Sequence, residues 1–209
     1  MHEFQKMNQQ SLVSVIISTY NREKYVRRAI GSVLGQTYKN IEFVIVDNAS
    51  TDKTPEIISE FGKNDSRIII LTNRIHLTYV KSYNKGIVIA RGKYIAMICD
   101  DDYWCDENKL EKQVDFLEKD CDYVLTGGGI IKIDKNGKEI IRQLRPETDE
   151  KIRKSILLGC IFVYSTVVFR KESWEQVGGF NEDIGYYVDD WDLWLKLGKI
   201  GKFYNFISF

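Results

Sequence analysis

The sequence predicts an α/β fold with a mostly parallel central sheet and helices on both faces. The first observation is alternation: apolar, strand-like runs are separated by segments with helical spacing through the first 126 residues. The second is that these runs are continuously apolar, as in parallel strands buried on both faces, rather than alternating apolar and polar. The predicted strands are Val13–Ser18, Ile41–Val46, Arg67–Leu71, Tyr94–Cys99 and Tyr123–Thr126.

Four helices are predicted between these strands. They run from Tyr25 through Leu34, from Thr54 to Phe61, from Tyr79 to Ala90, and from Asp106 or Glu107 through Leu117. Asn21 is expected to cap the first helix, because its side chain can accept hydrogen bonds from free backbone N–H groups. Pro55 suits the first turn of the second helix, where a missing N–H costs nothing.

The pattern changes after Gly127. Two apolar runs flank the turn sequence Asp-Lys-Asn-Gly, which predicts a hairpin attached to the sheet. A strand, a short helix ended by two glycines and an amphipathic helix should follow. In order, these elements are the hairpin strands Ile130–Ile133 and Glu139–Ile141, the strand Cys160–Phe169, and the helices Lys171–Val177 and Asp190–Leu197.

Composition indicates a soluble globular domain. The chain has 209 residues, 44% of them hydrophobic and 29% charged, with 30 basic residues balancing 30 acidic ones. This balance gives no electrostatic case for nucleic-acid binding. The N-terminal MHEFQKMNQQ has no signal-peptide pattern, and no apolar run reaches the roughly 20 residues that a spanning helix needs. A cytoplasmic location is therefore expected.

Cysteine and histidine chemistry is disfavoured. The 4 cysteines form no CxxC pair, so they are expected to be buried thiols rather than zinc ligands or disulfides. Only His2 and His76 are present, which leaves little material for a histidine-based catalytic triad. Carboxylates must therefore carry any acid–base chemistry.

The segment YIAMICDDDYW delivers Asp100, Asp101 and Asp102 directly after a predicted buried strand. A solvated loop is the ordinary interpretation of an acidic triplet. However, ligands bind beyond the carboxyl ends of strands in parallel sheets. Adjacent carboxylates repel by roughly 1 kcal/mol per pair in water and about 4 kcal/mol at an effective dielectric of 20. A cation is therefore expected here, and oxygen-only ligands favour Mg²⁺ or Mn²⁺.

Two further acidic positions stand out. Asp47 ends the second strand, where it could accept hydrogen bonds from a ligand or simply form a turn. Asp189 and Asp190 lie in the aromatic segment YYVDDWDLW, where either could begin a helix. A carboxylate beside aromatic rings can also be tuned as a general base. Trp191 and Trp194 are expected to pack rather than to bind sugar.

Five segments in order, SVIISTYNRE, FVIVDNASTDKT, YIAMICDDDYW, VGGFNED and DDWDLWLKLG, resemble family 2 glycosyltransferases with the GT-A fold, over about Ser14 to Phe206. The resemblance implies a Rossmann-like sheet with a small C-terminal mixed subregion. It implies one domain, 1–209, with a nucleotide-binding half (about 11–126) and an acceptor-side half (about 127–209). It further implies inverting transfer from a nucleoside-diphosphate sugar, UDP favoured, to an acceptor hydroxyl.

The resemblance also implies roles for particular residues. Thr19 and Tyr20 would border the nucleobase, and Asp47 would contact the base or ribose. Asp100 would face the ribose, and Asp190 would be the catalytic base.

For the cation, Mn²⁺ or Mg²⁺, Asp101 would be the ligand between the two phosphates and Asp102 a supporting or alternative ligand. The implied acceptor is a saccharide or lipid-linked saccharide in surface polysaccharide or glycolipid assembly. Peripheral association with the inner face of a membrane is left open.

The chain departs from the family pattern in two places. Cys99 stands where an acid is usual, so the metal register could be Cys99-Asp100-Asp101 or could use Asp101 and Asp102. Asp189 replaces the usual Glu. The alternatives are a catalytically inactive nucleotide-sugar-binding partner module and a sugar nucleotidyltransferase, although STYNRE lacks the glycine that the latter would show. A dehydrogenase is disfavoured because Gly127–Gly129 lacks GxGxxG spacing.

Overall fold

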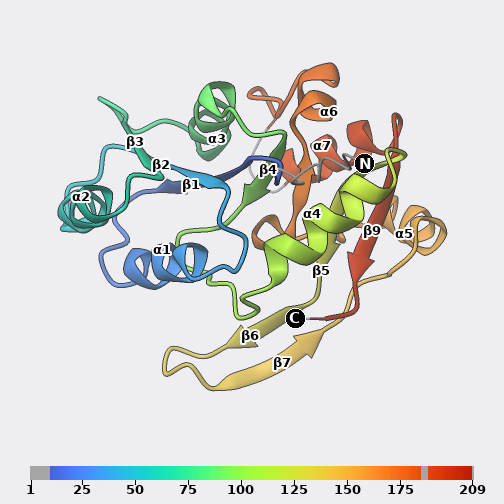
Figure 1. The fold of residues 1–209 in the computed structure, drawn as a ribbon, viewed down its shortest axis with the longest axis horizontal. Coiled ribbons are helices and arrows are strands. Elements are labelled where there is room, and N and C mark those ends of the chain that lie inside the picture. Colours follow the sequence, from blue (N-terminus) through green and yellow to red (C-terminus); the bar gives the residue numbers. More distant parts are fainter. Residues whose placement is uncertain (1–9, 185–187, 209) are drawn as a thin grey trace, which may run out of the picture.

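The computed structural model describes residues 10–184 and 188–208, which are organised around a seven-stranded sheet (Figure 1). The strand order is β3-β2-β1-β4-β8-β5-β9. β8 is antiparallel to β4 and β5, and the other pairs are parallel, so the predicted mostly parallel sheet is confirmed. The strands are β1 Val13–Thr19, β2 Ile41–Asp47, β3 Ile68–Thr72, β4 Tyr94–Met97, β5 Tyr123–Gly128, β8 Val168–Arg170 and β9 Lys202–Phe206.

Helices cover both faces of the sheet, as predicted. One core cluster joins strand residues to α3, α5, α6 and α7, and a second joins the opposite strand residues to α1, α2 and α4. The helices are α1 Val26–Leu34, α2 Thr54–Asn64, α3 Tyr79–Ile89, α4 Lys109–Lys119, α5 Asp149–Ile156, α6 Lys171–Gln176 and α7 Asp189–Leu197.

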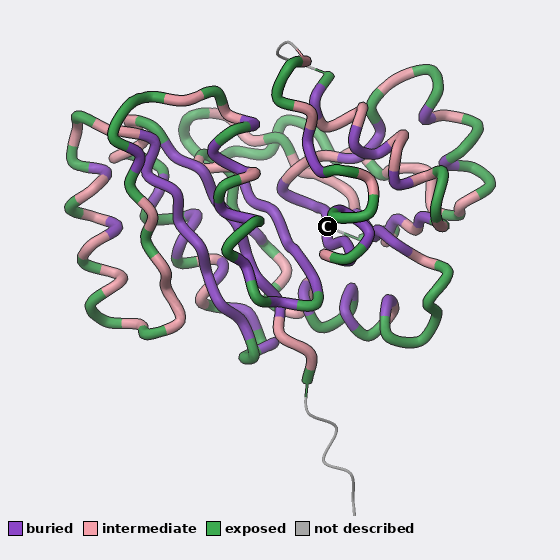
Figure 2. Tube along the Cα trace, turned by 90° about the horizontal axis from the view of Figure 1, so that it is seen from above, coloured by how far each residue is buried: buried purple, intermediate pink, exposed green. Residues whose placement is uncertain are grey.

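The central strands are buried along their whole length. Every residue of β1, β2 and β4 is buried, and Figure 2 shows these strands in the middle of the molecule with the exposed segments around them. The edge strand β3 is partly exposed. Continuous apolar runs therefore did indicate strands buried on both faces.

The predicted hairpin forms, but as a separate two-stranded sheet rather than as part of the main one. It consists of β6 Ile130–Ile133 and β7 Glu139–Gln143, which pair antiparallel at the lower edge of the view in Figure 1. Gly137 has a φ of 83° in its turn, a backbone conformation that side chains with a Cβ rarely adopt. The carboxylate of Asp134 closes the turn by accepting from two backbone N–H groups.

Several local predictions were wrong. Cys160–Phe169 is not one strand: Tyr164–Thr166 forms a 3-10 turn, η1, and only Val168–Arg170 joins the sheet. The segment is apolar because it is buried, but Ser165 and Thr166 divert its backbone by bonding to groups outside a strand ladder. Helix α5 and strand β9 were not predicted.

Two predictions about single side chains also fail. Asn21 does not cap α1; it adopts a φ of 54° and accepts hydrogen bonds from the N–H groups of Thr51 and Asp52. The expected burial of the cysteines holds only in part, because Cys99 is half-buried whereas the other three are exposed. None of the described helices has the length and apolar character needed to span a bilayer. The N-terminal residues 1–9 lie outside the described residues.

Candidate active site

The site is built at the edge of the sheet where the parallel strands β1, β2 and β4 end. Thr19 pairs with Asp47 at the last position of the β1–β2 ladder. Asp100 follows β4, which pairs with β1 on the side of β1 away from β2. Because parallel strands end at one edge, the residues predicted for the donor side come together here.

Tyr20 forms an aromatic pair that sequence reasoning missed. Its ring lies against that of His76, with centroids 4.1 Å apart, and Tyr20 is 38% exposed. His76 Nδ1 lies 3.3 Å from the carbonyl oxygen of Asn48. Thr19 is buried, and its hydroxyl has no well-formed hydrogen bond within the described parts of the chain. The partly open aromatic face of Tyr20 suits a planar ligand.

Asp47 is buried at the end of β2 and takes part in the turn that follows. Its Oδ1 accepts a hydrogen bond of 3.2 Å from the N–H of Ser50, and Ala49 between them has a φ of 66°. Asp47 therefore does form a turn, which is one of the two roles that the sequence suggested for it. It uses one carboxylate oxygen of Asp47 and leaves the other for a ligand.

Asp100 is the member of the triplet that forms an ion pair among the described residues. The Nε of Arg22 lies 3.3 Å from its Oδ1, and the N–H of Tyr20 lies 3.4 Å from its Oδ2. Burial raises the pKa of the Asp100 carboxyl, while the charge of Arg22 lowers it. Arg22 was not predicted, because its partner lies 78 residues away in sequence.

Asp101 and Asp102 face different surroundings. Both residues are exposed, and Asp101 has no hydrogen-bond partner among the described residues. The Oδ2 of Asp102 accepts a hydrogen bond of 2.5 Å from the hydroxyl of Ser165. Burial raises the pKa of Asp102, Ser165 opposes the shift, and the charge of Asp101 adds to it.

The 3-10 turn η1 links the acidic triplet to the second acidic position. Ser165 bonds Asp102, and the neighbouring Tyr164 donates its hydroxyl hydrogen to Oδ2 of Asp189. The Ser165 hydroxyl also accepts from the N–H of Cys99, at 2.9 Å. Adjacent residues of one turn therefore position two carboxylates that are 87 residues apart in sequence.

Asp190 is the freer of the two acids that begin α7. Asp189 is only 7% exposed and is occupied by Tyr164. Asp190 is partly exposed; its Oδ2 accepts from the thiol of Cys160 at 3.3 Å, and its Oδ1 accepts from the N–H of Trp191 at 2.7 Å. Burial raises the pKa of Asp190, and the Cys160 thiol opposes the shift. Tyr186 and Tyr187 of this motif lie outside the described residues.

A cavity of about 150 Å³ adjoins Asp102 on the side of α4. It lies between α4, the end of β5 and β6, and Trp104, Lys109 and Phe206 contribute to its wall. The Nζ of Lys109 donates to Gln113 at 2.7 Å and lies 4.3 Å from the ring centroid of Trp104. Burial lowers the pKa of Lys109 to about 7.

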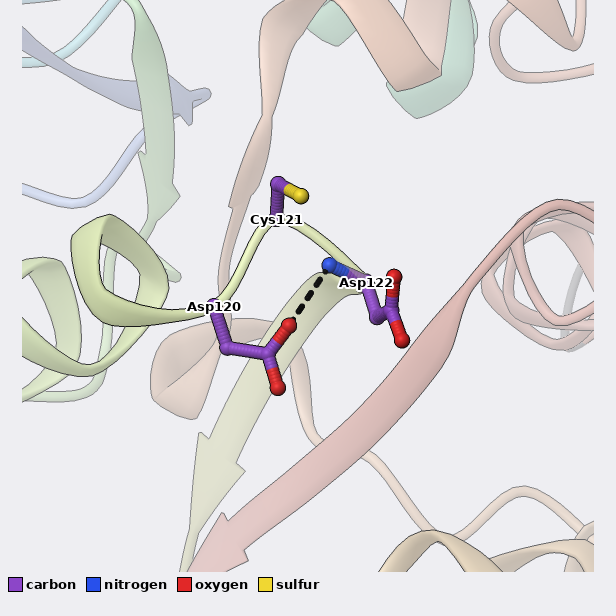
Figure 3. Close-up of side chains that lie close together, drawn as sticks. All are labelled: Asp120, Cys121 and Asp122. Atoms are coloured by element: carbon purple, nitrogen blue, oxygen red, sulfur yellow. Dashed lines mark hydrogen bonds between the residues drawn. The ribbon is translucent and has the colours of Figure 1, made fainter.

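A second acidic group, Asp120, Cys121 and Asp122, is not part of this site (Figure 3). Its side chains are exposed in the turn before β5, at the opposite end of that strand from Gly128. Asp120 Oδ1 accepts from the N–H of Asp122 at 2.9 Å, and Asp122 pairs with Lys202 at 2.7 Å. These contacts explain why the three side chains lie together in a turn.

The acidic triplet has the donor set that a divalent cation requires. Asp101 and Asp102 offer carboxylate oxygens, which suit Mg²⁺ and Mn²⁺. Cys99 does not complete this set, because its sulfur contacts the hydroxyl of Tyr79 at 3.3 Å and burial raises its pKa to about 12. Among the described residues, the ligand atoms of the triplet are not gathered as those of Asp120, Cys121 and Asp122 are, so its fit to a cation is one of ligand chemistry and not of observed geometry.

The sequence model of "Glycosyl transferase family 2" matches residues 14–178. The chain belongs to glycosyl transferase family 2. Relatives include an uncharacterized glycosyltransferase of Methanocaldococcus jannaschii, which is 34% identical over 88% of this chain and 64% of its own length. The chain thus spans a little under two thirds of that relative. The Escherichia coli UDP-Glc:alpha-D-GlcNAc-diphosphoundecaprenol beta-1,3-glucosyltransferase WfaP is 33% identical over 89% of this chain and 70% of its own length.

Solved structures show that the fold is GT-A. Residues 1–349 of Staphylococcus aureus TarS, in complex with UDP-GlcNAc, superimpose with a TM-score of 0.76, at 20% identity, over 94% of this chain and 56% of that TarS chain. The mannosyltransferase PcManGT of Pyrobaculum calidifontis, in complex with GDP-Man and Mn²⁺, gives 0.73 at 19% identity, over 96% of this chain and 55% of its own. The GT-A prediction is therefore confirmed.

Proposed function

We propose that this protein transfers a sugar, with inversion, from a nucleoside-diphosphate sugar to an acceptor hydroxyl. The observation that carries the proposal is that η1 is hydrogen-bonded to both acidic regions. Ser165 donates to Asp102 in the acidic triplet, and Tyr164 donates to Asp189 beside Asp190. A donor bound at the triplet and an acceptor bound at α7 would then meet across a single turn.

On the donor side, Tyr20 would lie against the nucleobase, with Thr19 and the free oxygen of Asp47 available to the base or ribose. Asp100 would accept a hydrogen bond from a ribose hydroxyl, since Arg22 favours its ionised form. UDP is the favoured nucleotide. The UDP-Glc in the name of WfaP and the UDP-GlcNAc bound to TarS support this choice, whereas PcManGT holds GDP-Man.

Asp101 and Asp102 would hold Mn²⁺ or Mg²⁺. When bound, such a cation neutralises charge on the departing diphosphate, which removes the need for a protein acid at that position. The carboxylates suit this task, and Ser165 fixes the direction of one of them. The Mn²⁺ present with PcManGT supports a divalent ion.

Asp190 would be the general base. Its Oδ2 would take the proton of the acceptor hydroxyl as the hydroxyl oxygen attacks the anomeric carbon from the face opposite the diphosphate. Burial raises its pKa, which strengthens it as a base while its partial exposure leaves it within reach of an acceptor. A glycosidase would need an acid as well as a base around the bond that it breaks.

The acceptor would be a saccharide or lipid-linked saccharide in surface polysaccharide or glycolipid assembly. WfaP supports this, because its name gives a diphosphoundecaprenol-linked acceptor. The site of action would be the cytoplasm, with peripheral contact at the inner face of the membrane.

A nucleotide-sugar-binding module without transfer activity is the second candidate. Cys99 favours it, since a protonated thiol stands where the family usually has an acid. This candidate predicts metal-dependent nucleotide binding with neither sugar transfer nor donor hydrolysis.

A thermal-shift panel tests the donor half of the proposal. UDP, GDP, dTDP and their common sugar conjugates would each be tested with and without Mn²⁺ on wild type, Asp101→Asn and the exposed control Asp115→Asn. We expect Mn²⁺-dependent stabilisation by one base family, retained in Asp115→Asn and weakened in Asp101→Asn. No shift with any nucleotide at millimolar concentration would refute the proposal.

A further inference from the structure

The cavity beside Asp102 opens at the same edge of the sheet as the acidic triplet. β4 and β5 are both antiparallel to β8, so they run in the same direction and end at one edge. The triplet follows β4, and Gly128, the last residue of β5, lines the cavity together with Asp102. Asp102 and Cys105 in its wall are exposed, so a ligand can enter from solvent. The cavity therefore adjoins the candidate site, although the proposed transfer makes no use of its other residues.

Lys109 brings to this cavity a cation that forms no ion pair with a described residue. Its Nζ donates to Oε1 of Gln113 at 2.7 Å and lies 4.3 Å from the ring centroid of Trp104. Both of these side chains line the cavity, so the ammonium lies at its wall. The neighbouring Lys112, in contrast, pairs with Asp106 at 2.8 Å. An ammonium has three N–H donors, and Gln113 takes only one of those of Lys109.

The two side chains that contact Lys109 are themselves fixed. Nε2 of Gln113 donates to the carbonyl oxygen of Thr166 at 2.9 Å, and Nε1 of Trp104 donates to that of Ser165 at 2.6 Å. Gln113 and Trp104 are both buried. The ammonium is therefore held in place before a ligand arrives, which lowers the entropic cost of binding.

The charges of the wall suit a ligand with one negative charge. The charged residues that line the cavity are Asp102, Asp106, Lys109 and Lys112. Because Asp106 is paired with Lys112, Lys109 is the cation that remains for a ligand. Burial lowers the pKa of Lys109 to about 7, as expected for a cation without a close counter-ion. Asp102 would repel a second negative charge. A carboxylate therefore fits this wall better than a phosphate dianion does.

The volume and the rest of the wall suit a single sugar ring. A volume of about 150 Å³ is enough for one six-membered ring. Phe206, Ile130 and Val163 offer apolar surface, against which the C–H face of a sugar can pack. Such a combination of apolar walls and a few placed polar groups is typical of small-molecule sites.

We infer that this cavity binds a sugar ring that carries one carboxylate, with the carboxylate on Lys109 and the ring against the apolar wall. The inference rests on the proposed function in one respect, because it takes the ring to be a sugar. Hydrogen bonds between an ammonium and a carboxylate are stronger than those between neutral groups, so the charge gives the site its selectivity. The substrate class is thereby narrowed to sugar acids, as the transferred sugar or as part of the acceptor.

The test follows the indole N–H signal of Trp104 by ¹H–¹⁵N NMR, identified by its absence from Trp104→Phe. Glucuronate and glucose, which differ only at C6, are titrated into protein saturated with UDP and Mg²⁺. The pH is 6, where Lys109 is protonated. We expect a saturable shift with glucuronate, and glucuronate binding at least about tenfold tighter than glucose, because of one charge-assisted contact. Lys109→Gln should remove this preference, whereas the control Lys119→Gln, at the exposed other end of α4, should keep it.

Three outcomes would overturn the inference. They are equal binding of the two sugars, a preference for glucuronate that survives in Lys109→Gln, and a Trp104 signal that neither sugar moves up to its solubility limit. The comparison of the two sugars in wild type does not depend on any variant. Should Lys109→Gln fail to fold, Lys109→Met takes its place. UDP binding is measured first in every sample, so failure of the donor site is recognised separately.

A second titration identifies which substrate carries the acid. UDP-glucuronate and UDP-glucose are compared in wild type and in Lys109→Gln, each with Mg²⁺. A preference for UDP-glucuronate that requires Lys109 places the carboxylate on the transferred sugar. Equal affinities for the two donors, together with the preference for free glucuronate, place it on the acceptor.

Discussion

Two carboxylates of the site, Asp100 and Asp190, are both partly buried but are held in opposite ways. Burial raises the pKa of each. Asp100 has a cation, Arg22, 3.3 Å away, whereas the side-chain partner of Asp190 is a neutral thiol. The pKa of both carboxyls is therefore raised, but a charge opposes the rise at Asp100, whereas only neutral donors oppose it at Asp190. This difference accords with the proposal that Asp100 accepts hydrogen bonds from the donor and that Asp190 takes up a proton.

The largest effect should come from removing the base. Asp190→Asn is expected to lower sugar-transfer turnover by about 10²- to 10⁴-fold, because an amide cannot accept the acceptor's proton. Nucleotide affinity should change little. Turnover is measured as nucleoside-diphosphate release with an acceptor that wild type uses. The control is Asp192→Asn on the same helix, where Asp192 pairs with Lys196. Equal losses of turnover in both variants would show that Asp190 is not the general base.

The second-largest effect should come from breaking the hydrogen bond between η1 and Asp102. Ser165→Ala removes the bonds of its hydroxyl to Asp102 and to the N–H of Cys99. Because a buried donor and a carboxylate lose their partner, we expect the free energy of unfolding to fall by about 1–3 kcal/mol. The Mn²⁺ concentration needed for nucleotide binding should also rise. Urea unfolding and a Mn²⁺ titration measure the two effects, and unchanged Mn²⁺ dependence would separate Ser165 from the cation site.

The third effect concerns Arg22, the cation beside Asp100, and tests how Asp100 differs from Asp190. Arg22→Gln takes away the charge that lowers the pKa of Asp100. Since an ionised Asp100 accepts more strongly from ribose than a neutral one, the acid midpoint of nucleotide binding should move to higher pH. At neutral pH the affinity should fall by only about two- to fivefold, because Arg22 is 43% exposed and such pairs are weak. Isothermal titration from pH 4 to 8 tests this; a midpoint that moves to lower pH would contradict it.

The smallest effect should come from the thiol. Cys160 donates to Asp190 and thereby lowers its pKa. Cys160→Ala should therefore raise that pKa and move the acid limb of the pH–rate profile to higher pH, by less than about one unit, since the contact is a single weak hydrogen bond. The limb is measured with kcat/KM between pH 4 and 8. A shift toward lower pH would show that the thiol does not act on Asp190 as described.

These two regions also differ in how far sequence could predict them. Asp47 and the triplet Asp100 to Asp102 were recognised because each follows a buried strand, and parallel strands place their ends together. That reasoning needs only local pattern and one rule of sheet geometry. It also predicted helices on both faces, whereas the GT-A fold was implied by the resemblance of five segments to family 2 glycosyltransferases.

The region of η1 and α7 was predicted poorly, because its contacts are distant in sequence and its backbone is irregular. Ser165 meets Asp102 across 63 residues, and Cys160 meets Asp190 across 30. The run from Cys160 to Phe169 has the composition of a strand, but buried polar partners turn it into η1. Local propensity cannot indicate such a partner, so Tyr164 and Ser165 were not identified as site residues. Arg22 and His76, beside Asp100 and Tyr20, were missed for the same reason.

The most direct test of the account is a calorimetric titration of UDP with Mn²⁺ into wild type, Asp102→Asn and Asp190→Asn. We expect Mn²⁺-dependent binding in wild type and in Asp190→Asn, and a loss of at least about tenfold in Asp102→Asn, where a charged ligand has been removed. Equal binding by all three proteins, or equal loss in both variants, would contradict the division of the site into a donor side and a base.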